Sequence, residues 1–305
     1  MKRGKGLKLG VIGVGSMGRN HARIAAGLAG VKLIGVADLS ASAAEETGKT
    51  IGVPFYTDYH QLLPYAEAIC IATPTQTHFE IAQECLNAGK HLLIEKPFTG
   101  DQSNARQLIS LAAKKELILA IGLIERFNPA FQKLIKEIKG EKLIGLDIKR
   151  LSPYPERIAD TDVVLDMMFH DIDLLLSIVR EEISSVKAKG EKIRSKLLDR
   201  VIATITFSNG IIARIEASRV FSSKTRNICV TTEKSFIEAN LLNKTIYVRD
   251  FSTPTPSSLP IKAADQLTEE LKDFIVSIKS RKQPTVSGED ALKVITLAED
   301  IRKKC

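Results

Sequence analysis

Short apolar runs alternate with stretches of helical periodicity along the first part of the chain. The runs predict strands at residues 7–14, 31–37, 55–56, 67–72, 91–94 and 117–122. The stretches between them predict helices at 17–28, 40–50, 75–88 and 101–114. Strands that alternate with helices form a parallel sheet covered on both faces. We therefore expect residues 1–123 to form a doubly wound α/β domain.

After residue 123 the pattern changes, and strands come to dominate. Helices are predicted at 130–138 and 166–179, with a strand at 142–151 and a proline-broken loop at 152–158 between them. Further strands are predicted at 183–189, 200–207, 211–218, 226–232, 236–239 and 245–249. Ser208-Asn209-Gly210 is typical of a hairpin turn. A Ser/Thr/Pro-rich segment at 251–260 predicts a mobile loop, and helices at 264–280 and 288–304 follow it. Residues 124–305 are thus expected to form an α+β domain with an open, mostly antiparallel sheet.

Composition and charge narrow the class of protein. The 305 residues carry a net charge of +8, but the basic residues are spread along the chain without interleaved aromatic residues, so nothing favours nucleic acid as a partner. No apolar run reaches about 18 residues, and glycines interrupt the sequence after the basic N-terminus, so we expect neither a membrane span nor a signal peptide. The four cysteines are far apart and form no CxxC pair, which fits a reduced cytoplasm better than disulfides or zinc.

A glycine motif follows the first predicted strand. Gly13-Val14-Gly15-Ser16-Met17-Gly18 has the spacing G-x-G-x-x-G and opens the first predicted helix. Gly13 allows the tight turn, Gly15 lets the backbone approach a pyrophosphate, and Gly18 lets the helix pack closely on the strand. The N–H groups at the start of that helix, including those of Ser16 and Met17, favour phosphate. The motif therefore predicts a Rossmann dinucleotide-binding domain.

An aspartate ends the second predicted strand and indicates which dinucleotide binds. Asp38 lies twenty residues after Gly18, where a carboxylate accepts hydrogen bonds from the adenosine ribose hydroxyls. The same charge repels a 2′-phosphate, and no arginine occurs among the four residues that follow Asp38. The sequence therefore favours NAD over NADP as cofactor.

The strand that begins at His91 ends in Glu95-Lys96-Pro97. Ligands of open α/β sheets bind outside the carboxyl ends of the strands, so a lysine at this position is a candidate for ligand contact. Taken alone, however, the segment is better explained by a surface salt bridge, because exposed Lys and Glu residues are common.

The helix predicted at 166–179 carries two polar candidates. Asp166 and His170 lie four residues apart and away from the apolar stripe of the helix, so His170 is not expected to be a core residue. A carboxylate one turn away orients an imidazole and supports its charge, which suits His170 as a general base. Asp166 is alternatively a simple N-cap of the helix. No third ligand at metal spacing accompanies the pair, and we expect no metal site there.

Four motifs together give the chain a family resemblance. They are the stretch from Gly13 to His21, the Thr73-Pro74 pair with His78, Glu95-Lys96-Pro97, and the Asp166 to His170 segment. The sequence resembles the glucose–fructose oxidoreductase/inositol dehydrogenase/MocA family of nicotinamide enzymes along essentially its whole length.

The resemblance implies roles for these residues. Lys96 lies beside the nicotinamide and the reacting carbon in such enzymes, where a fixed cation stabilises alkoxide character on the substrate oxygen. Thr73, Pro74, His78 and Glu95 would contribute to cofactor binding, with Glu95 holding the lysine or contacting the nicotinamide ribose. The resemblance also implies a homodimer or homotetramer formed through the open face of the second sheet. A non-catalytic NAD-binding sensor on the same scaffold is the alternative to an enzyme.

Two further segments resemble one branch of the family, the UDP-N-acetylglucosamine 3-dehydrogenases, which oxidise the sugar 3-hydroxyl to a ketone. These segments are 125–129 and 153–158. They suggest Arg126, Asn128 and Arg157 as substrate-binding residues beside Asp166 and His170, because two arginines can pair bidentately with a pyrophosphate. Each arginine is alternatively part of a structural ion pair. Thr161-Asp162 stands where relatives more often have a glycine-containing turn, and this difference changes how the chain enters the helix of Asp166 and His170. Inositol or a simple sugar is therefore an alternative substrate.

Overall fold

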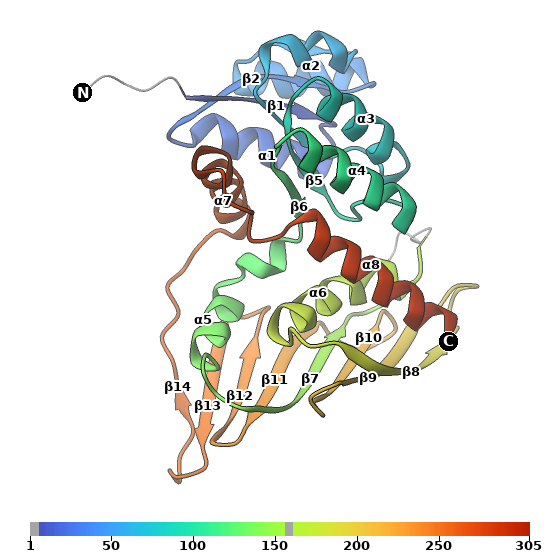
Figure 1. Ribbon diagram of the computed structural model, residues 1–305, viewed down its shortest axis with the longest axis vertical. Coiled ribbons are helices and arrows are strands. Elements are labelled where there is room, and N and C mark those ends of the chain that lie inside the picture. Colours follow the sequence, from blue (N-terminus) through green and yellow to red (C-terminus); the bar gives the residue numbers. More distant parts are fainter. Residues whose placement is uncertain (1–5, 156–160) are drawn as a thin grey trace. The chain divides into compact units, whose positions relative to one another are not determined.

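The chain divides into two compact units. The computed structural model describes residues 6–155 and 161–305 (Figure 1). Unit 1 comprises Met1–Ile124 together with Leu267–Leu292, and unit 2 comprises Glu125–Gln266 together with Lys293–Cys305. The expectation that residues 124–305 form one continuous domain is therefore corrected, because residues 267–292 belong to unit 1.

Unit 1 contains a six-stranded parallel sheet. Its strands are β1 (Leu7–Ile12), β2 (Val31–Ala37), β3 (Phe55–Tyr56), β4 (Ala68–Ile71), β5 (His91–Glu95) and β6 (Leu119–Gly122). They pair in the order β3-β2-β1-β4-β5-β6, with every neighbouring pair parallel. The doubly wound prediction is confirmed. Strand order reverses between β1 and β4, and the carboxyl ends at such a reversal form the crevice in which dinucleotides bind.

Helices connect these strands as the apolar spacing predicts. They are α1 (Ser16–Gly27), α2 (Ala41–Ile51), α3 (Thr75–Asn87) and α4 (Gln102–Lys114), with short 3₁₀ turns η1 (Tyr59–Gln61) and η2 (Leu63–Tyr65). Ser40 caps α2 by accepting a hydrogen bond from the Ala43 N–H, and Asp101 caps α4 through the Asn104 N–H. Such caps satisfy backbone donors that the first turn leaves free.

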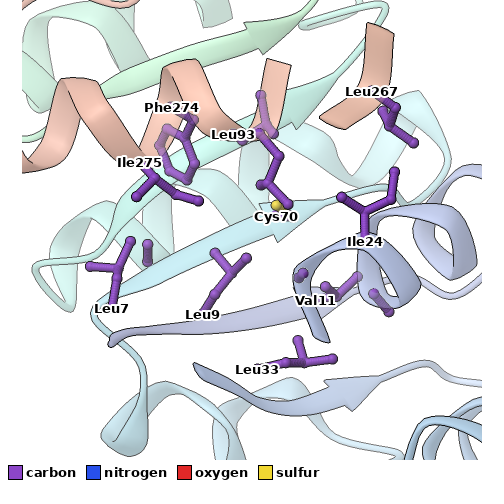
Figure 2. Close-up of a cluster of buried hydrophobic side chains, with 14 of the residues drawn as sticks. Leu7, Leu9, Val11, Ile24, Leu33, Cys70, Leu93, Leu267, Phe274 and Ile275 are labelled. Atoms are coloured by element: carbon purple, nitrogen blue, oxygen red, sulfur yellow. The ribbon is translucent and has the colours of Figure 1, made fainter. Parts of the chain in front are cut away.

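Helix α7 (Gln266–Ser280) completes the core of unit 1. Its residues Leu267, Leu271, Phe274 and Ile275 are buried in one cluster with Leu9 and other side chains of the parallel sheet and α1 (Figure 2). The spacing of these four residues places them on one face of the helix. Burial of that face explains why the sequence around α7 belongs to unit 1.

Unit 2 is built on an open eight-stranded sheet. Its strands are β7 (Leu143–Leu151), β8 (Ile183–Glu191), β9 (Arg200–Phe207), β10 (Ile212–Ser218), β11 (Thr225–Thr232), β12 (Ser235–Asn240), β13 (Thr245–Asp250) and β14 (Ser257–Ser258). The order is β14-β13-β12-β11-β7-β10-β9-β8, and among the described strands of this sheet only β7 and β10 pair in parallel. The mostly antiparallel sheet is confirmed. The segment predicted as a loop at 251–260 contains β14, which pairs with β13.

Helices cover one face of this sheet. Unit 2 contains η3 (Ile124–Phe127), α5 (Pro129–Glu137), the π-helical turn η4 (Val164–Met168), α6 (Phe169–Ile178) and the greater part of α8 (Gly288–Lys303). Figure 1 shows α5 and α6 on the same side of the strands, and both helices contact the sheet. None of the described helices has the length and apolarity needed to cross a membrane.

Candidate active site

The glycine loop between β1 and α1 has the geometry that phosphate binding requires. Gly13 has φ +84°, and a Cβ on Gly18 would lie 1.8 Å from the Gly13 carbonyl oxygen, so neither position accepts a side chain. Gly15 borders open space and precedes a helix that has no side-chain cap and no acidic residue in its first turn. The N–H groups at Ser16 and Met17 therefore face a site suited to an anion.

Asp38 fixes this loop to the end of β2. Its Oδ2 accepts a hydrogen bond from the Val14 N–H at 2.8 Å, and its Oδ1 accepts one from the Ser40 N–H at 2.8 Å. The carboxylate remains partly exposed beside the glycine loop. Its oxygens can thus accept hydrogen bonds from ribose hydroxyls, and its charge disfavours a 2′-phosphate.

His78 joins the segments that follow β4 and β5. It is 1% exposed, and its Nδ1 lies 2.9 Å from the Pro97 carbonyl oxygen while its Nε2 lies 2.8 Å from that of Thr73. Both ring nitrogens therefore lie within hydrogen-bond distance of a backbone carbonyl oxygen. Buried in this way, His78 supports the Thr73-Pro74 turn and the Lys96-Pro97 segment from beneath.

Lys96 follows the last residue of β5, and the Lys96-Pro97 peptide bond is cis. The Glu95 carboxylate accepts a hydrogen bond from the Lys96 backbone N–H at 3.2 Å through Oε2, and its Oε1 lies 2.7 Å from Nε2 of His21. Glu95 therefore pairs with His21. Within residues 6–155 and 161–305, no salt bridge joins Glu95 to the Lys96 ammonium. Lys96 is partly exposed and directly follows β5 at the carboxyl edge of the sheet, where ligands bind.

Three residues around Glu95 complete its environment, and we did not predict their roles from the sequence. A Cβ on Gly122 of β6 would lie 3.2 Å from the Glu95 Cα, Cδ and Oε2, so glycine makes room for the carboxylate. His21, in the helix that follows the glycine loop, and Glu270 of α7 each place one polar atom within 4.8 Å of Glu95 and of each other. The sequence does contain one sign of the unusual position of Glu270, because its carboxylate lies on the otherwise apolar face of a predicted helix.

In unit 2, Asp166 lies in η4 and His170 in the first turn of α6. Both are partly exposed, whereas Met168 and Ile172 are fully buried. Asp162 provides the N-terminal cap instead, since its Oδ1 accepts hydrogen bonds from the N–H groups of residues 164 and 165 at 3.0 and 3.2 Å. The interpretation of Asp166 as an N-cap is therefore wrong. Asp166 is partly exposed within a π-helical turn, and such turns often occur at functional sites.

The segment before this helix is held by a buried arginine. Arg219 is 1% exposed and donates from Nη1 to the Thr161 carbonyl at 2.8 Å and from Nε to Asp199 at 2.9 Å. Asp199 also accepts hydrogen bonds from three consecutive N–H groups, those of residues 193–195. Thr161 is thus held through its carbonyl by Arg219, while Asp162 accepts hydrogen bonds from the N–H groups of residues 164 and 165.

The structure corrects two of the predicted substrate-binding residues. Arg126 donates from Nε to both carboxylate oxygens of Asp173, at 3.0 and 2.9 Å, and both side chains are buried. Asn128 caps α5 through the Ala130 N–H and donates from Nδ2 to the Leu241 carbonyl at 3.0 Å. These contacts give both residues structural roles. For Arg126 this is the structural ion pair that was the alternative to substrate binding. Arg157 lies outside the described residues.

A buried charge network also reaches the helix of His170. Arg150 of β7 donates from Nε to Asp171 at 2.9 Å and from Nη1 to Glu125 at 3.0 Å. Arg226 adds a contact with Glu125 at 3.2 Å. The carboxylates of Glu125 and Asp171 thus join η3, β7 and α6, and this framework holds His170, the neighbour of Asp171, on its helix.

Comparison with known proteins agrees with this arrangement. A model of the oxidoreductase family with an NAD-binding Rossmann fold matches residues 7–123, and a model of the GFO/IDH/MocA C-terminal domain matches residues 149–238. The chain belongs to the GFO/IDH/MocA oxidoreductase family. It is an NAD-dependent enzyme that acts on CH–OH groups. The glycine loop and Asp38 fit that cofactor.

Relatives of this GFO/IDH/MocA protein differ in substrate. The UDP-N-acetylglucosamine 3-dehydrogenase of Acidithiobacillus ferrooxidans is 33% identical over 97% of this chain and 96% of its own. Its crystal structure matches with a TM-score of 0.93, covering 98% of this chain and 97% of that one. A myo-inositol 2-dehydrogenase of Thermotoga maritima is 28% identical over 97% of this chain and 96% of its own. Levoglucosan dehydrogenase in complex with NADH and L-sorbose shares the fold, with a TM-score of 0.88 at 20% identity, covering 99% of this chain and 97% of that one.

Proposed function

We propose that the protein oxidises a sugar hydroxyl to a ketone, and that its substrate is the 3-hydroxyl of UDP-N-acetylglucosamine. The observation that carries this proposal is the place of Lys96 directly after β5, at the carboxyl edge of the sheet that binds NAD, where the Glu95 carboxylate accepts a hydrogen bond from the Lys96 backbone N–H. The substrate assignment draws support from the 33% identical UDP-N-acetylglucosamine 3-dehydrogenase, which this chain matches along nearly its whole length.

The residues have distinct roles in this reaction. The glycine loop and Asp38 hold the dinucleotide, and Thr73, Pro74 and Glu95 line its nicotinamide end. NAD supplies a hydride acceptor for the hydrogen on the carbinol carbon. Lys96 orients the hydroxyl oxygen and stabilises its alkoxide character as the carbonyl forms. His170 accepts the hydroxyl proton, and Asp166 orients His170 or accepts a hydrogen bond from a neighbouring substrate hydroxyl.

A cyclitol or a free sugar is the second candidate substrate. Arg126 is occupied by Asp173, which removes one of the two arginines suggested for a pyrophosphate. The 28% identical myo-inositol 2-dehydrogenase matches the chain over the same length. The two candidates differ in whether a nucleotide is needed on the substrate.

The test is NADH formation, followed by absorbance, with UDP-N-acetylglucosamine, UDP-glucose, N-acetylglucosamine and myo-inositol. Turnover only with the N-acetylated nucleotide sugar is the expected result, and product analysis then locates the ketone. Turnover of myo-inositol instead would select the second candidate. Binding of NAD without turnover of any compound would contradict the proposed activity and favour a sensor.

Replacement of the lysine tests the mechanism. Lys96→Ala is expected to lower kcat by about 10²–10³-fold, because one preorganised group that stabilises the developing oxyanion is lost. The dissociation constant for NAD should change little, as measured by calorimetry. Lys114→Ala, at an exposed lysine of α4, is the matched control. An unchanged rate in Lys96→Ala would show that this ammonium takes no part in hydride transfer.

We further propose that the protein is a homodimer or homotetramer through the face of the unit 2 sheet that α5 and α6 leave uncovered. That face carries the 53% exposed Ile212 and a ladder of charges in which Arg214 pairs with Asp147 at 3.2 Å and with Glu216 at 2.9 Å. Light scattering coupled to size-exclusion chromatography measures the mass. A monomer at assay concentration would contradict this assignment.

A further inference from the structure

Glu270 is a carboxyl group buried without a counter-charge. It lies on the apolar face of α7, between Leu267 and Phe274, and is 2% exposed. Neither of its oxygens has a hydrogen-bond partner among the described residues. An ionised carboxylate in such a place costs several kcal/mol, so the neutral acid is the favoured form.

Within the described parts of the chain, the groups that face Glu270 come from four elements and include neither lysine nor arginine. Glu95 at the end of β5 and His21 of α1 lie within 4.8 Å of it, as measured between polar atoms. Burial, followed by the negative charges of Glu95 and Asp273, raises the pKa of Glu270 well above its ordinary value. Burial above all raises the pKa of the Cys70 thiol on β4, so Cys70 stays neutral.

A shared proton explains the cluster better than a metal ion. One histidine and two carboxylates are ligands that a divalent cation accepts. However, His21 Nε2 and Glu95 Oε1 lie 2.7 Å apart, which is a hydrogen-bond distance. Two tetrahedral ligands at about 2.0–2.2 Å from one zinc ion would lie about 3.4 Å apart. These two atoms are therefore joined by a proton, which leaves Glu270 to be neutralised by a proton of its own.

We propose that Glu270 is a neutral carboxylic acid and a positioning residue, which holds the Glu95–His21 pair and through it Lys96. As an acid, its O–H can donate toward the Glu95 carboxylate after a small side-chain rotation or through one water molecule. As an anion, it would repel Glu95 and displace the carboxylate that accepts the Lys96 backbone N–H. The protonation of Glu270 thus determines where the lysine is held.

The first test needs no substrate. Glu270→Gln keeps the shape of the acid but does not titrate, and Glu269→Gln is the matched control on a half-exposed side chain that pairs with Lys272. A carboxyl whose pKa is raised in the folded state favours that state most below its unfolded pKa, near 4.5, and increasingly less as the pH rises toward the folded pKa. The melting temperature of Glu270→Gln should therefore rise relative to wild type by several degrees between about pH 5 and about pH 8.

Three results decide this test. The neutral acid is supported if the melting temperature of Glu270→Gln rises relative to wild type with increasing pH, while that of Glu269→Gln keeps a constant difference from wild type. A difference that stays constant or narrows with rising pH shows that Glu270 is ionised and overturns the proposal. Stoichiometric metal in the purified wild-type protein, with a melting temperature lowered by a chelator, overturns it in favour of a cation site.

The second test concerns positioning and rests on the proposed dehydrogenase activity. Glu270→Ala is expected to lower kcat about tenfold with little change in the dissociation constant for NAD, and Glu270→Gln should restore most of the rate. Equal rates in Glu270→Ala and wild type would refute the positioning role. If wild type turns over no substrate, the proposed function fails, while the pH dependence of melting still decides the protonation of Glu270.

Discussion

The ion pair between Arg126 and Asp173 offers a stringent test of the interpretation of unit 2. The sequence suggested Arg126 as a pyrophosphate ligand, whereas the structure commits its guanidinium to Asp173, with Nη2 at 2.6 Å from Oδ1. The perturbation is Arg126→Met, which removes the charge and keeps most of the side-chain length. Asp173→Asn and the double variant complete a cycle in which the coupling between the two side chains is measured directly.

The expected magnitude follows from burial. At about 3 Å and an effective dielectric constant of about 20, the attraction amounts to roughly 5–6 kcal/mol, and it largely offsets the desolvation of both ions. Arg126→Met leaves Asp173, which is 0% exposed, without its cation, so the free energy of unfolding should fall by about 3–5 kcal/mol. At about 2–4 °C per kcal/mol for a domain of this size, the melting temperature falls by about 6–20 °C.

The assay is denaturant unfolding of the four proteins in the cycle. The double variant should be more stable than the sum of the single effects predicts, by at least about 2 kcal/mol, because it buries no unpaired charge. Lys133→Met is the control, since Lys133 pairs with Glu137 at 2.7 Å on α5 with both side chains about a third exposed, and should cost less than about 1 kcal/mol. A loss below about 1 kcal/mol in Arg126→Met, with a raised KM for the nucleotide sugar alone, would return Arg126 to the substrate site.

Two further predictions follow from tight packing and from buried charge. Gly122→Ala places a methyl group 3.2 Å from the Glu95 carboxylate, and it should lower kcat more than it changes the dissociation constant for NAD, as steady-state kinetics and calorimetry measure. An unchanged kcat would show that the Glu95 position is not critical. Burial opposes ionisation of Asp199, but N–H donors from residues 195, 194 and 193 hold its pKa below the ordinary value. Its contribution to stability is therefore present above about pH 4 and lost as the pH falls further. Asp199→Asn should show a weaker loss of melting temperature on acidification than wild type, and an identical acid profile would contradict this.

The sequence was informative where function depends on local geometry. Gly13, Gly15 and Gly18 lie within six residues of one another, and each has the conformation or clearance that its position in the motif predicts. The strands of unit 1 could be predicted because each is a short apolar run between helices. Asp38 and Lys96 could be placed at the carboxyl edge because each directly follows such a strand.

Interactions between residues far apart in the sequence could not be predicted in the same way. Arg126 and Asp173 are 47 residues apart, and nothing local distinguishes a buried ion pair from two surface charges. Asn128 is likewise occupied by the Leu241 carbonyl, 113 residues away. The N-cap was the alternative for Asp166 because helical spacing does not reveal that a π-helical turn from Val164 to Met168 precedes α6.

The return of α7 to unit 1 has a consequence for biosynthesis. The two parts of unit 1 are separated by 142 residues of unit 2, which a ribosome adds in about 7–30 s at about 5–20 residues per second. During that interval the nascent first part lacks Leu271 and Phe274, and the apolar surface that they cover is exposed. The dinucleotide-binding fold is therefore completed only after residues 125–266 of unit 2 have been synthesised, and a chain interrupted before α7 also lacks Glu270, which lies close to Glu95.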